Sequence, residues 1–119
     1  DLSGWSEKER AWHVQPPLDV LQALVAVRLH LDECGEDDGP LRVVPGSHRL
    51  GRIGADAARE VKARSAEVTC PAQRGAAMVM RPLLLHASSK ARGGSRRRVL
   101  HFLFGPRVLP YGLHWQATA

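Results

Sequence analysis

Two residues in the last third of the chain, His86 and Arg97, are of types that could act together in a reaction. An apolar run over residues 81–86 predicts a strand that brings His86 to the edge of a sheet, where its imidazole could bind a divalent metal. Arg97 opens a second apolar run, residues 97–104, and its guanidinium could hold a carboxylate by two charge-assisted hydrogen bonds. A metal beside a carboxylate clamp is what a 2-oxo acid co-substrate requires. The alternative is a partly buried strand histidine followed by a solvated basic loop.

The second run alternates in polarity, as a strand does. One face would be apolar after its first residue, whereas the other mixes charge, imidazole and aliphatic groups, as the interior of a ligand-binding barrel would. The apolar face holds Arg98, Leu100, Phe102 and Phe104, and the mixed face holds Arg97, Val99, His101 and Leu103. We therefore predict that Arg97 and His86 point into one cavity.

Length and composition indicate a single globular domain over residues 1–119, with 44% hydrophobic residues. A net charge of +5 fits an anionic partner. The basic residues gather at residues 90–98 without interleaved aromatic residues, so nucleic-acid binding is the least supported class. No run could span a membrane, no secretory signal opens the chain, and Cys34 and Cys70 form no metal or redox motif, so we expect a cytoplasmic protein.

Short strands separated by turns, with one helix inserted, favour an antiparallel sandwich or barrel. The clearest strand is residues 24–32, with Val25, Val27, Leu29 and Leu31 on an apolar face and Arg28, His30 and Asp32 on a polar one. Further strands are predicted at residues 41–44, 66–70 and 76–80. A single helical turn is expected at residues 18–22 and a longer helix at residues 55–63, while residues 1–10 are expected to form a loop.

Several segments resemble the phytanoyl-CoA dioxygenase family, which belongs to the Fe(II)- and 2-oxoglutarate-dependent oxygenases. They are Leu29-His-Leu-Asp-Glu-Cys34, Gly39-Pro-Leu-Arg-Val-Val-Pro-Gly-Ser-His48, Arg81-Pro-Leu-Leu-Leu-His-Ala-Ser-Ser89 and Arg97-Arg-Val-Leu-His101. The second segment is the most specific, and the resemblance covers residues 12–115. It implies a mainly β fold, a double-stranded β-helix or jelly roll with one short helix.

In that family, iron sits on a His-x-Asp pair and a distal histidine. The resemblance implies that His86 is the distal iron ligand and that Arg97 pairs with the far carboxylate of 2-oxoglutarate. The family's His-x-Asp lies upstream of the region that resembles residues 13–17, and no His-x-Asp precedes that region here. We therefore expect a partial, truncated jelly roll with about six of eight strands, inactive as this chain, and we assign no catalytic residue.

Other histidines leave alternatives open. His30 and Asp32 form a local His-x-Asp whose side chains would share one strand face, and with His86 they would complete two histidines and one carboxylate. The resemblance favours a non-ligand role for His30. His13 and Gln15 could line the co-substrate pocket or belong to a capped loop.

Two functional classes follow from these residues. The first is an Fe(II)/2-oxoglutarate oxygenase that hydroxylates a small molecule, or a truncated relative of one. The second is a non-catalytic jelly-roll module that binds a small anionic ligand without iron. Missing strands would leave sheet edges unpaired, so we expect a homo-oligomer, most simply a dimer, joined on the side of residues 24–32 or at the termini.

Overall fold

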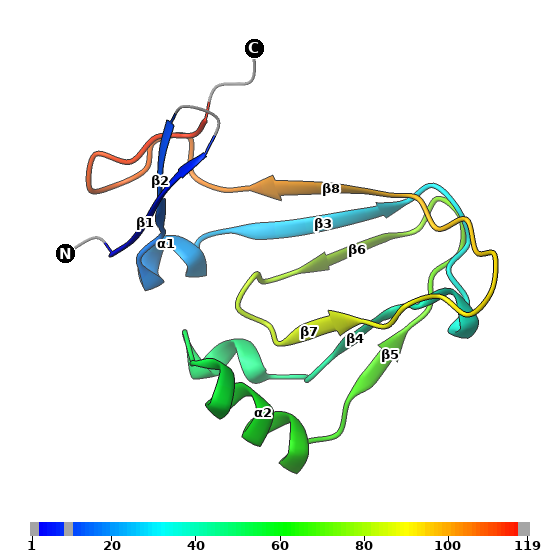
Figure 1. The fold of residues 1–119 in the computed structure, drawn as a ribbon. Coiled ribbons are helices and arrows are strands. Elements are labelled where there is room, and N and C mark those ends of the chain that lie inside the picture. The colour runs from blue at the N-terminus through cyan, green and yellow to red at the C-terminus, as the bar shows by residue number, and fades with distance from the viewer. Residues whose placement is uncertain (1–2, 9–10, 117–119) are drawn as a thin grey trace.

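The structure, a computed structural model, describes residues 3–8 and 11–116, with side chains from Gln15 onward (Figure 1). Two antiparallel three-stranded sheets, with strand orders β6-β3-β8 and β5-β4-β7, make up its main body. Their strands are β3 (Val25–His30), β4 (Leu41–Val43), β5 (Val68–Cys70), β6 (Ala77–Met80), β7 (His86–Ser88) and β8 (Val99–Phe104). The prediction of a mainly β fold is confirmed.

The two sheets meet in a small apolar core. Ala26 and Met80 from the first sheet pack with Leu41 and Val43 from the second, and Cys70, Met78 and Leu84 pack against this cluster. Because strand residues alternate between faces, these contacts define the inner face of each sheet. Other side chains on the same face of each sheet as these core residues therefore also point into the interior of the fold.

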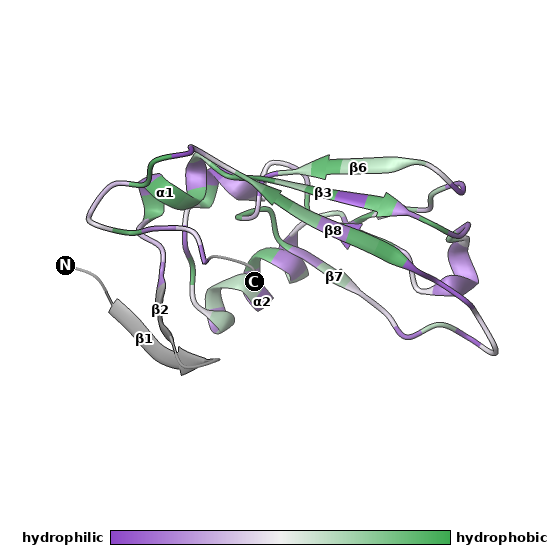
Figure 2. Ribbon diagram, turned by 90° about the horizontal axis from the view of Figure 1, so that it is seen from above, coloured by the Kyte–Doolittle hydropathy of each residue, from purple (hydrophilic) through white to green (hydrophobic). Residues whose placement is uncertain are grey.

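β3 is the central strand of the first sheet, and its register decides which residues share the inner face. Ala26 lies opposite Met80 and Leu103, Arg28 opposite Met78 and His101, and His30 opposite Val99. The polar face predicted for residues 24–32 is therefore the inner one. The apolar face, with Val25, Val27 and Leu29, therefore turns outward. Figure 2 shows β3 between β6 and β8, both of them coloured as largely hydrophobic strands.

The helices follow the sequence closely. Helix α1 (Leu18–Gln22) starts after Pro17, whose carbonyl accepts the first helical hydrogen bond, and α2 (Ala55–Arg64) runs one residue beyond its predicted end. The segments η1 (Glu36–Asp38) and η2 (Ser47–Leu50) are short 3₁₀ helices. Within the described residues, no helix is both long enough and apolar enough to cross a membrane.

Two expectations about strands are wrong. The run 81–86 is a turn closed by a hydrogen bond from Leu84 N to the Arg81 carbonyl oxygen, and the strand begins at His86 instead of ending there. Pro82 lacks an N–H for a ladder, and Leu84 packs on the core. Residues 1–10 are not all loop, because β1 (Ser3–Lys8) pairs with β2 (Ala11–Gln15). That expectation rested on polar side chains, whereas strand pairing uses backbone groups that nearly every residue carries.

Candidate functional site

Arg97 lies just before β8, and its half-buried side chain turns toward the start of β4. There the Arg97 Nη1 atom donates a hydrogen bond to the Gly39 carbonyl oxygen. Gly39 has φ +69°, and a Cβ at this position would collide with the Ser89 carbonyl oxygen and lie 2.9 Å from Arg97 Nη1. Only glycine fits such a conformation without strain. The Gly-Pro of the most specific motif thus makes room for the arginine.

The next residue, Arg98, has a different partner. Its Nε and Nη2 atoms donate to the Asp32 carboxylate at 2.9 and 3.1 Å, and its backbone N–H donates to the same group at 3.0 Å. These hydrogen bonds lower the pKa of Asp32 to about 2. Asp32 is therefore occupied by Arg98, and it is not available beside His30 as the local His-x-Asp alternative requires.

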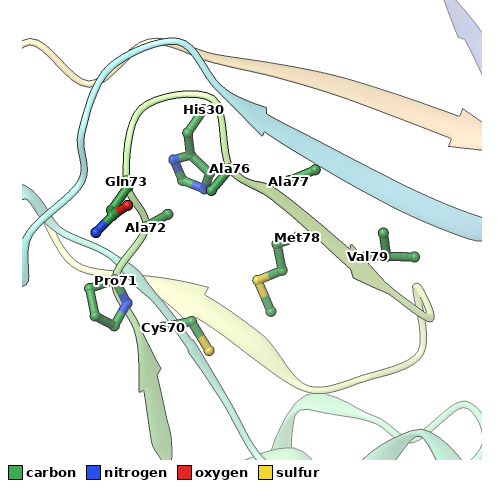
Figure 3. Close-up of a pocket in the computed structure, with 9 residues that line it drawn as sticks. All are labelled: His30, Cys70, Pro71, Ala72, Gln73, Ala76, Ala77, Met78 and Val79. Carbon is green, nitrogen blue, oxygen red and sulfur yellow. The ribbon is translucent and has the colours of Figure 1, made fainter.

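His30 is the most deeply buried polar side chain of the inner face, with an exposed fraction of 3%. Its Nδ1 atom has no hydrogen-bond partner among the described residues. Burial lowers the pKa of His30, and the positive charges of Arg28 and Arg97 lower it further, so the ring is neutral at pH 7. His30 lines a cavity of about 520 Å³ together with Cys70, Gln73 and Met78. Figure 3 shows its imidazole pointing from β3 toward the loop of Gln73.

Arg28 stands on the same face, half-buried between its cross-strand neighbours Met78 and His101. Its Nε atom is buried, and no described residue accepts a hydrogen bond from it. We name the set Arg28, His30 and Arg97 the inner basic cluster. Both arginine charges act on the His30 ring, so the three groups lie within electrostatic reach of one another.

No described carboxylate forms an ion pair with either arginine of the inner basic cluster. Asp38 feels the charge of Arg97, but its carboxylate already accepts hydrogen bonds from the Ser95 side chain and from Gly35 N at 2.8 Å. These contacts, the Ser95 bond foremost, hold the pKa of Asp38 below its usual value. Two cations without an acidic partner suit an anionic ligand, because buried charges are normally paired.

His86 opens β7 on the second sheet, opposite Val43 of β4. Its ring is exposed, and its Nδ1 atom lies 2.6 Å from the Leu84 carbonyl oxygen. A metal-binding histidine commonly donates its other ring N–H to such a carbonyl, which orients the free nitrogen toward the ion. The contact with Leu84 engages Nδ1, so it does not involve the Nε2 atom of His86.

A buried serine that the sequence reasoning did not single out holds the segment before His86. Ser47, 4% exposed, accepts a hydrogen bond from Leu85 N at 2.9 Å and donates one to the Val44 carbonyl oxygen at 2.6 Å. Val44 N donates in turn to the Leu85 carbonyl oxygen at 3.0 Å. The signal for Ser47 was its place in the specific motif that ends at His48. Arg28 was noted only as part of a polar face.

Fe(II) in oxygenases of this kind takes two histidines and one carboxylate. In the part of the chain that the structure describes, no three His, Cys, Asp or Glu side chains are grouped closely enough to hold a metal. The set of two histidines and one carboxylate is therefore not found among these residues. The side chain of His13 lies outside the described residues, and Gln15 is exposed.

The structure does not bring His86 and Arg97 into contact, and no described cavity is lined by both. They are nevertheless tied to one short segment, His86 through its partner Val43 in β4 and Arg97 through Gly39 just before β4. Val43 is four positions beyond Gly39, which at about 3.3 Å per residue is at most roughly 13 Å. A common cavity for the two side chains remains a prediction.

Comparisons with known proteins agree with this fold. AviO1 from Streptomyces viridochromogenes Tue57 is 29% identical with a TM-score of 0.64, over 74% of this chain and 39% of that one. EvdMO1 is 26% identical with a TM-score of 0.65, over 72% and 20%. EctD from S. alaskensis, solved with 2-oxoglutarate and 5-hydroxyectoine, is 21% identical with a TM-score of 0.63, over 71% and 31%, which shows a shared fold alone.

The chain thus spans between 20% and 39% of the length of these three structures. No curated protein matches it. A family model described as phytanoyl-CoA dioxygenase (PhyH) matches residues 2–99, which is most of the chain. The resemblance carried by the Gly39 to His48 motif and by the segments around His86 and Arg97 is therefore confirmed, and the chain belongs to the phytanoyl-CoA dioxygenase family.

Proposed function

We propose that Arg97 binds the far carboxylate of 2-oxoglutarate, as part of an Fe(II)/2-oxoglutarate-dependent oxygenase that hydroxylates a small molecule. The observation that carries this proposal is a half-buried arginine, fixed on Gly39, with no carboxylate partner among the described residues. Membership of the family supports it. So does the presence of 2-oxoglutarate in the related structure of EctD.

The chemistry of the guanidinium suits this role. Arg97 has five N–H donors in a planar fork. Its contacts with the Gly39 carbonyl oxygen and the Cys34 thiol use only part of this set, and the remaining donors can serve a ligand. The Gly39 contact also fixes the side chain before the ligand arrives, which reduces the entropy lost on binding. A carboxylate would then be held by parallel, charge-assisted hydrogen bonds.

His86 is the residue that we propose as an iron ligand. Its hydrogen bond to Leu84 keeps the Nε2 atom free. A metal site requires several deprotonated ligands held together, and one histidine leaves an ion largely solvated. We therefore expect the described residues alone to retain no stoichiometric Fe(II). Stoichiometric uptake by this chain that is lost on His30→Ala or Asp32→Ala would contradict that expectation.

Calorimetric titration with 2-oxoglutarate at low ionic strength tests the role of Arg97. Arg97→Met should weaken binding about tenfold or more, because a hydrogen bond to a charged group contributes about 1.5–3 kcal/mol. Arg98→Met is the matched control, because the neighbouring arginine points to Asp32 and should leave binding unchanged. Equal affinity of Arg97→Met and the unchanged chain would refute the proposal.

A second candidate is a non-catalytic module that binds a small anion. It is favoured by the lack of a three-ligand group among the described residues. Titration in the presence of redox-inert Mn(II) separates the two candidates. An oxygenase site should bind 2-oxoglutarate more tightly with the metal and should prefer it over glutarate. A simple anion module should bind both compounds alike, with or without the metal.

A further inference from the structure

We propose that Arg28 is a second carboxylate-binding residue, so that the inner basic cluster holds both ends of a 2-oxo dicarboxylate. This inference rests on the proposed role of Arg97 and deepens it. Arg97 takes the far carboxylate, and Arg28 takes the carboxylate next to the keto group. Three observations support this role of Arg28. They are its place in the sheet, its lack of an acidic partner among the described residues, and the state of the neighbouring His30.

The first observation is the place of Arg28 in the sheet. It stands on the central strand, on the inner face that also carries the core residues Ala26 and Met80. Its partner on β8 is His101, four residues beyond Arg97. At about 3.3 Å per residue the two arginines are separated by at most roughly 13 Å along the strand. Both guanidinium groups also act electrostatically on the His30 ring, so the proposal puts one small dicarboxylate between them.

The second observation is that Arg28 has no acidic partner. Four other arginines do form ion pairs: Arg42 with Glu67, Arg59 with Asp56, Arg92 with Asp37 and Arg98 with Asp32. Arg28 is half-buried, and its Nε atom is shielded from solvent without a hydrogen-bond acceptor in the described part of the chain. Burying a cation in this way is unfavourable unless an anion compensates it.

The third observation is the state of the residue beside Arg28. His30 is 97% buried, since its exposed fraction is 3%, and its Nδ1 atom is unpartnered among the described residues. It lines the cavity shown in Figure 3. A neutral imidazole can donate one hydrogen bond to a carboxylate without adding a third charge to the cluster. His30 thus adds a donor near the two arginines, and Asp38, the carboxylate that feels the charge of Arg97, is already held by Ser95 and Gly35.

Truncated ligands separate the two carboxylate positions. Levulinate keeps the keto group and the far carboxylate of 2-oxoglutarate but lacks the carboxylate beside the keto group. 2-Oxobutyrate keeps that carboxylate and lacks the far one. Calorimetry of the unchanged chain should show weaker binding of both compounds than of 2-oxoglutarate. Arg28→Met should abolish the preference for 2-oxoglutarate over levulinate, and Arg97→Met the preference over 2-oxobutyrate.

The magnitudes make the outcome decisive. Each lost preference should amount to about tenfold in the dissociation constant, and Arg98→Met should keep both preferences. If Arg28→Met keeps the preference over levulinate while Arg97→Met loses binding, this inference fails and the proposed function stands. If the unchanged chain does not bind 2-oxoglutarate at all, both fail.

Thermal stability distinguishes a binding role of Arg28 from a structural one, because loss of a structural residue would lower the midpoint of unfolding. A residue kept for binding is often unfavourable for folding, and replacing a buried unpaired charge by an apolar side chain of similar size tends to stabilise a protein. Arg28→Met should therefore raise the midpoint of thermal unfolding, or leave it unchanged, while it weakens binding. A fall in the midpoint with unchanged ligand preference would overturn the inference. Arg28→Lys, which keeps the charge but loses the fork, should show a partial loss of the same preference.

Discussion

Arg98 binds the Asp32 carboxylate through Nε at 2.9 Å and Nη2 at 3.1 Å, whereas the neighbouring Arg97 binds the Gly39 carbonyl oxygen. The pair joins the start of β8 to the end of β3, the two strands that make the longest ladder of the fold. Both arginines precede β8 and are held by different segments, Arg98 by Asp32 after β3 and Arg97 by Gly39 before β4. Replacing Arg98 therefore removes the contact with Asp32 and leaves the Gly39 contact of Arg97 in place.

The Asp32–Arg98 pair should make stability depend on pH in the acid range. The pKa of Asp32 falls from 3.8 to about 2 in the folded chain. A carboxyl with a lowered pKa stabilises the fold above its unfolded pKa, and this contribution is lost as the pH falls toward the folded value. Urea unfolding of the unchanged chain and Asp32→Asn should differ at pH 7 and converge between about pH 4 and pH 2.

The control for this experiment is Asp37→Asn. Asp37 meets Arg92 at 3.9 Å, and both side chains are largely exposed, so this substitution should change stability little at any pH. A stability difference for Asp32→Asn that persists unchanged down to pH 2 would show that the ion pair is not its source.

Ser47 should be important for stability and for the position of His86. Ser47→Ala removes the acceptor of the Leu85 N–H and leaves a buried donor unsatisfied, so the free energy of unfolding should fall by about 1–3 kcal/mol. Urea denaturation measures the loss, and the NMR signals of the His86 ring should shift in the same variant. Ser88→Ala, on an exposed position of β7, is the control. Unchanged His86 signals in Ser47→Ala would argue against its positioning role.

Gly39 should tolerate no side chain. Gly39→Ala forces a Cβ against Ser89 and Arg97, in addition to the strain of φ +69°. Gly93 has φ +80° but open space around it, so Gly93→Ala measures the backbone strain alone, about 1 kcal/mol. Gly39→Ala should lower the free energy of unfolding by more than Gly93→Ala and should also weaken 2-oxoglutarate binding. Equal costs for the two variants would mean that the close approach to Arg97 is unimportant.

The sequence predicted what depends on local pattern. The strand of residues 24–32 and both helices follow from periodicity and from residue types at helix ends. The strand expected before His86 was wrong because its apolar residues serve a turn that packs on the core. The roles of Ser47 and Gly39 depend on contacts with segments about 38 to 58 residues away in the chain, which no local pattern encodes.

The choice of inner face on β3 could not be predicted from composition either. The more apolar set, Val25, Val27 and Leu29, faces outward, and the inner face carries Arg28 and His30. An amphipathic strand normally places its apolar side in the core. This reversal agrees with the polar ligand proposed for the inner face, and it raises the question of what covers the outer one.

We propose that the chain self-associates through that outer face. Large apolar side chains are exposed on it: Val79 at 64%, Leu100 at 44%, Phe102 at 42% and Phe104 at 57%. Exposed apolar area costs about 25 cal/mol per Å², and β8 and β7 also present unpaired edges. β3 is paired on both sides, so the contact expected near residues 24–32 would use the face of that strand and not its edge.

Sedimentation across a range of concentrations tests this association. We expect dimers at micromolar concentration. Phe102→Ser should weaken the dimer, and Phe104→Ser, at the neighbouring exposed position, should weaken it as well. The two rings stack with centroids 6.3 Å apart. A monomer at high micromolar concentration in the unchanged chain would contradict the proposal.

The central claim is that the inner basic cluster binds a 2-oxo dicarboxylate, and NMR of the arginine side chains tests it most directly. Signals of the Nε–H groups can be followed one by one during a titration with 2-oxoglutarate, after assignment with Arg28→Lys, Arg97→Lys and Arg98→Lys. The account predicts that the Arg97 and Arg28 signals shift together and saturate, while the Arg98 signal stays in place because its Nε–H is held by Asp32. Equal, unsaturable shifts of all three signals, or a saturable shift confined to Arg98, would contradict it.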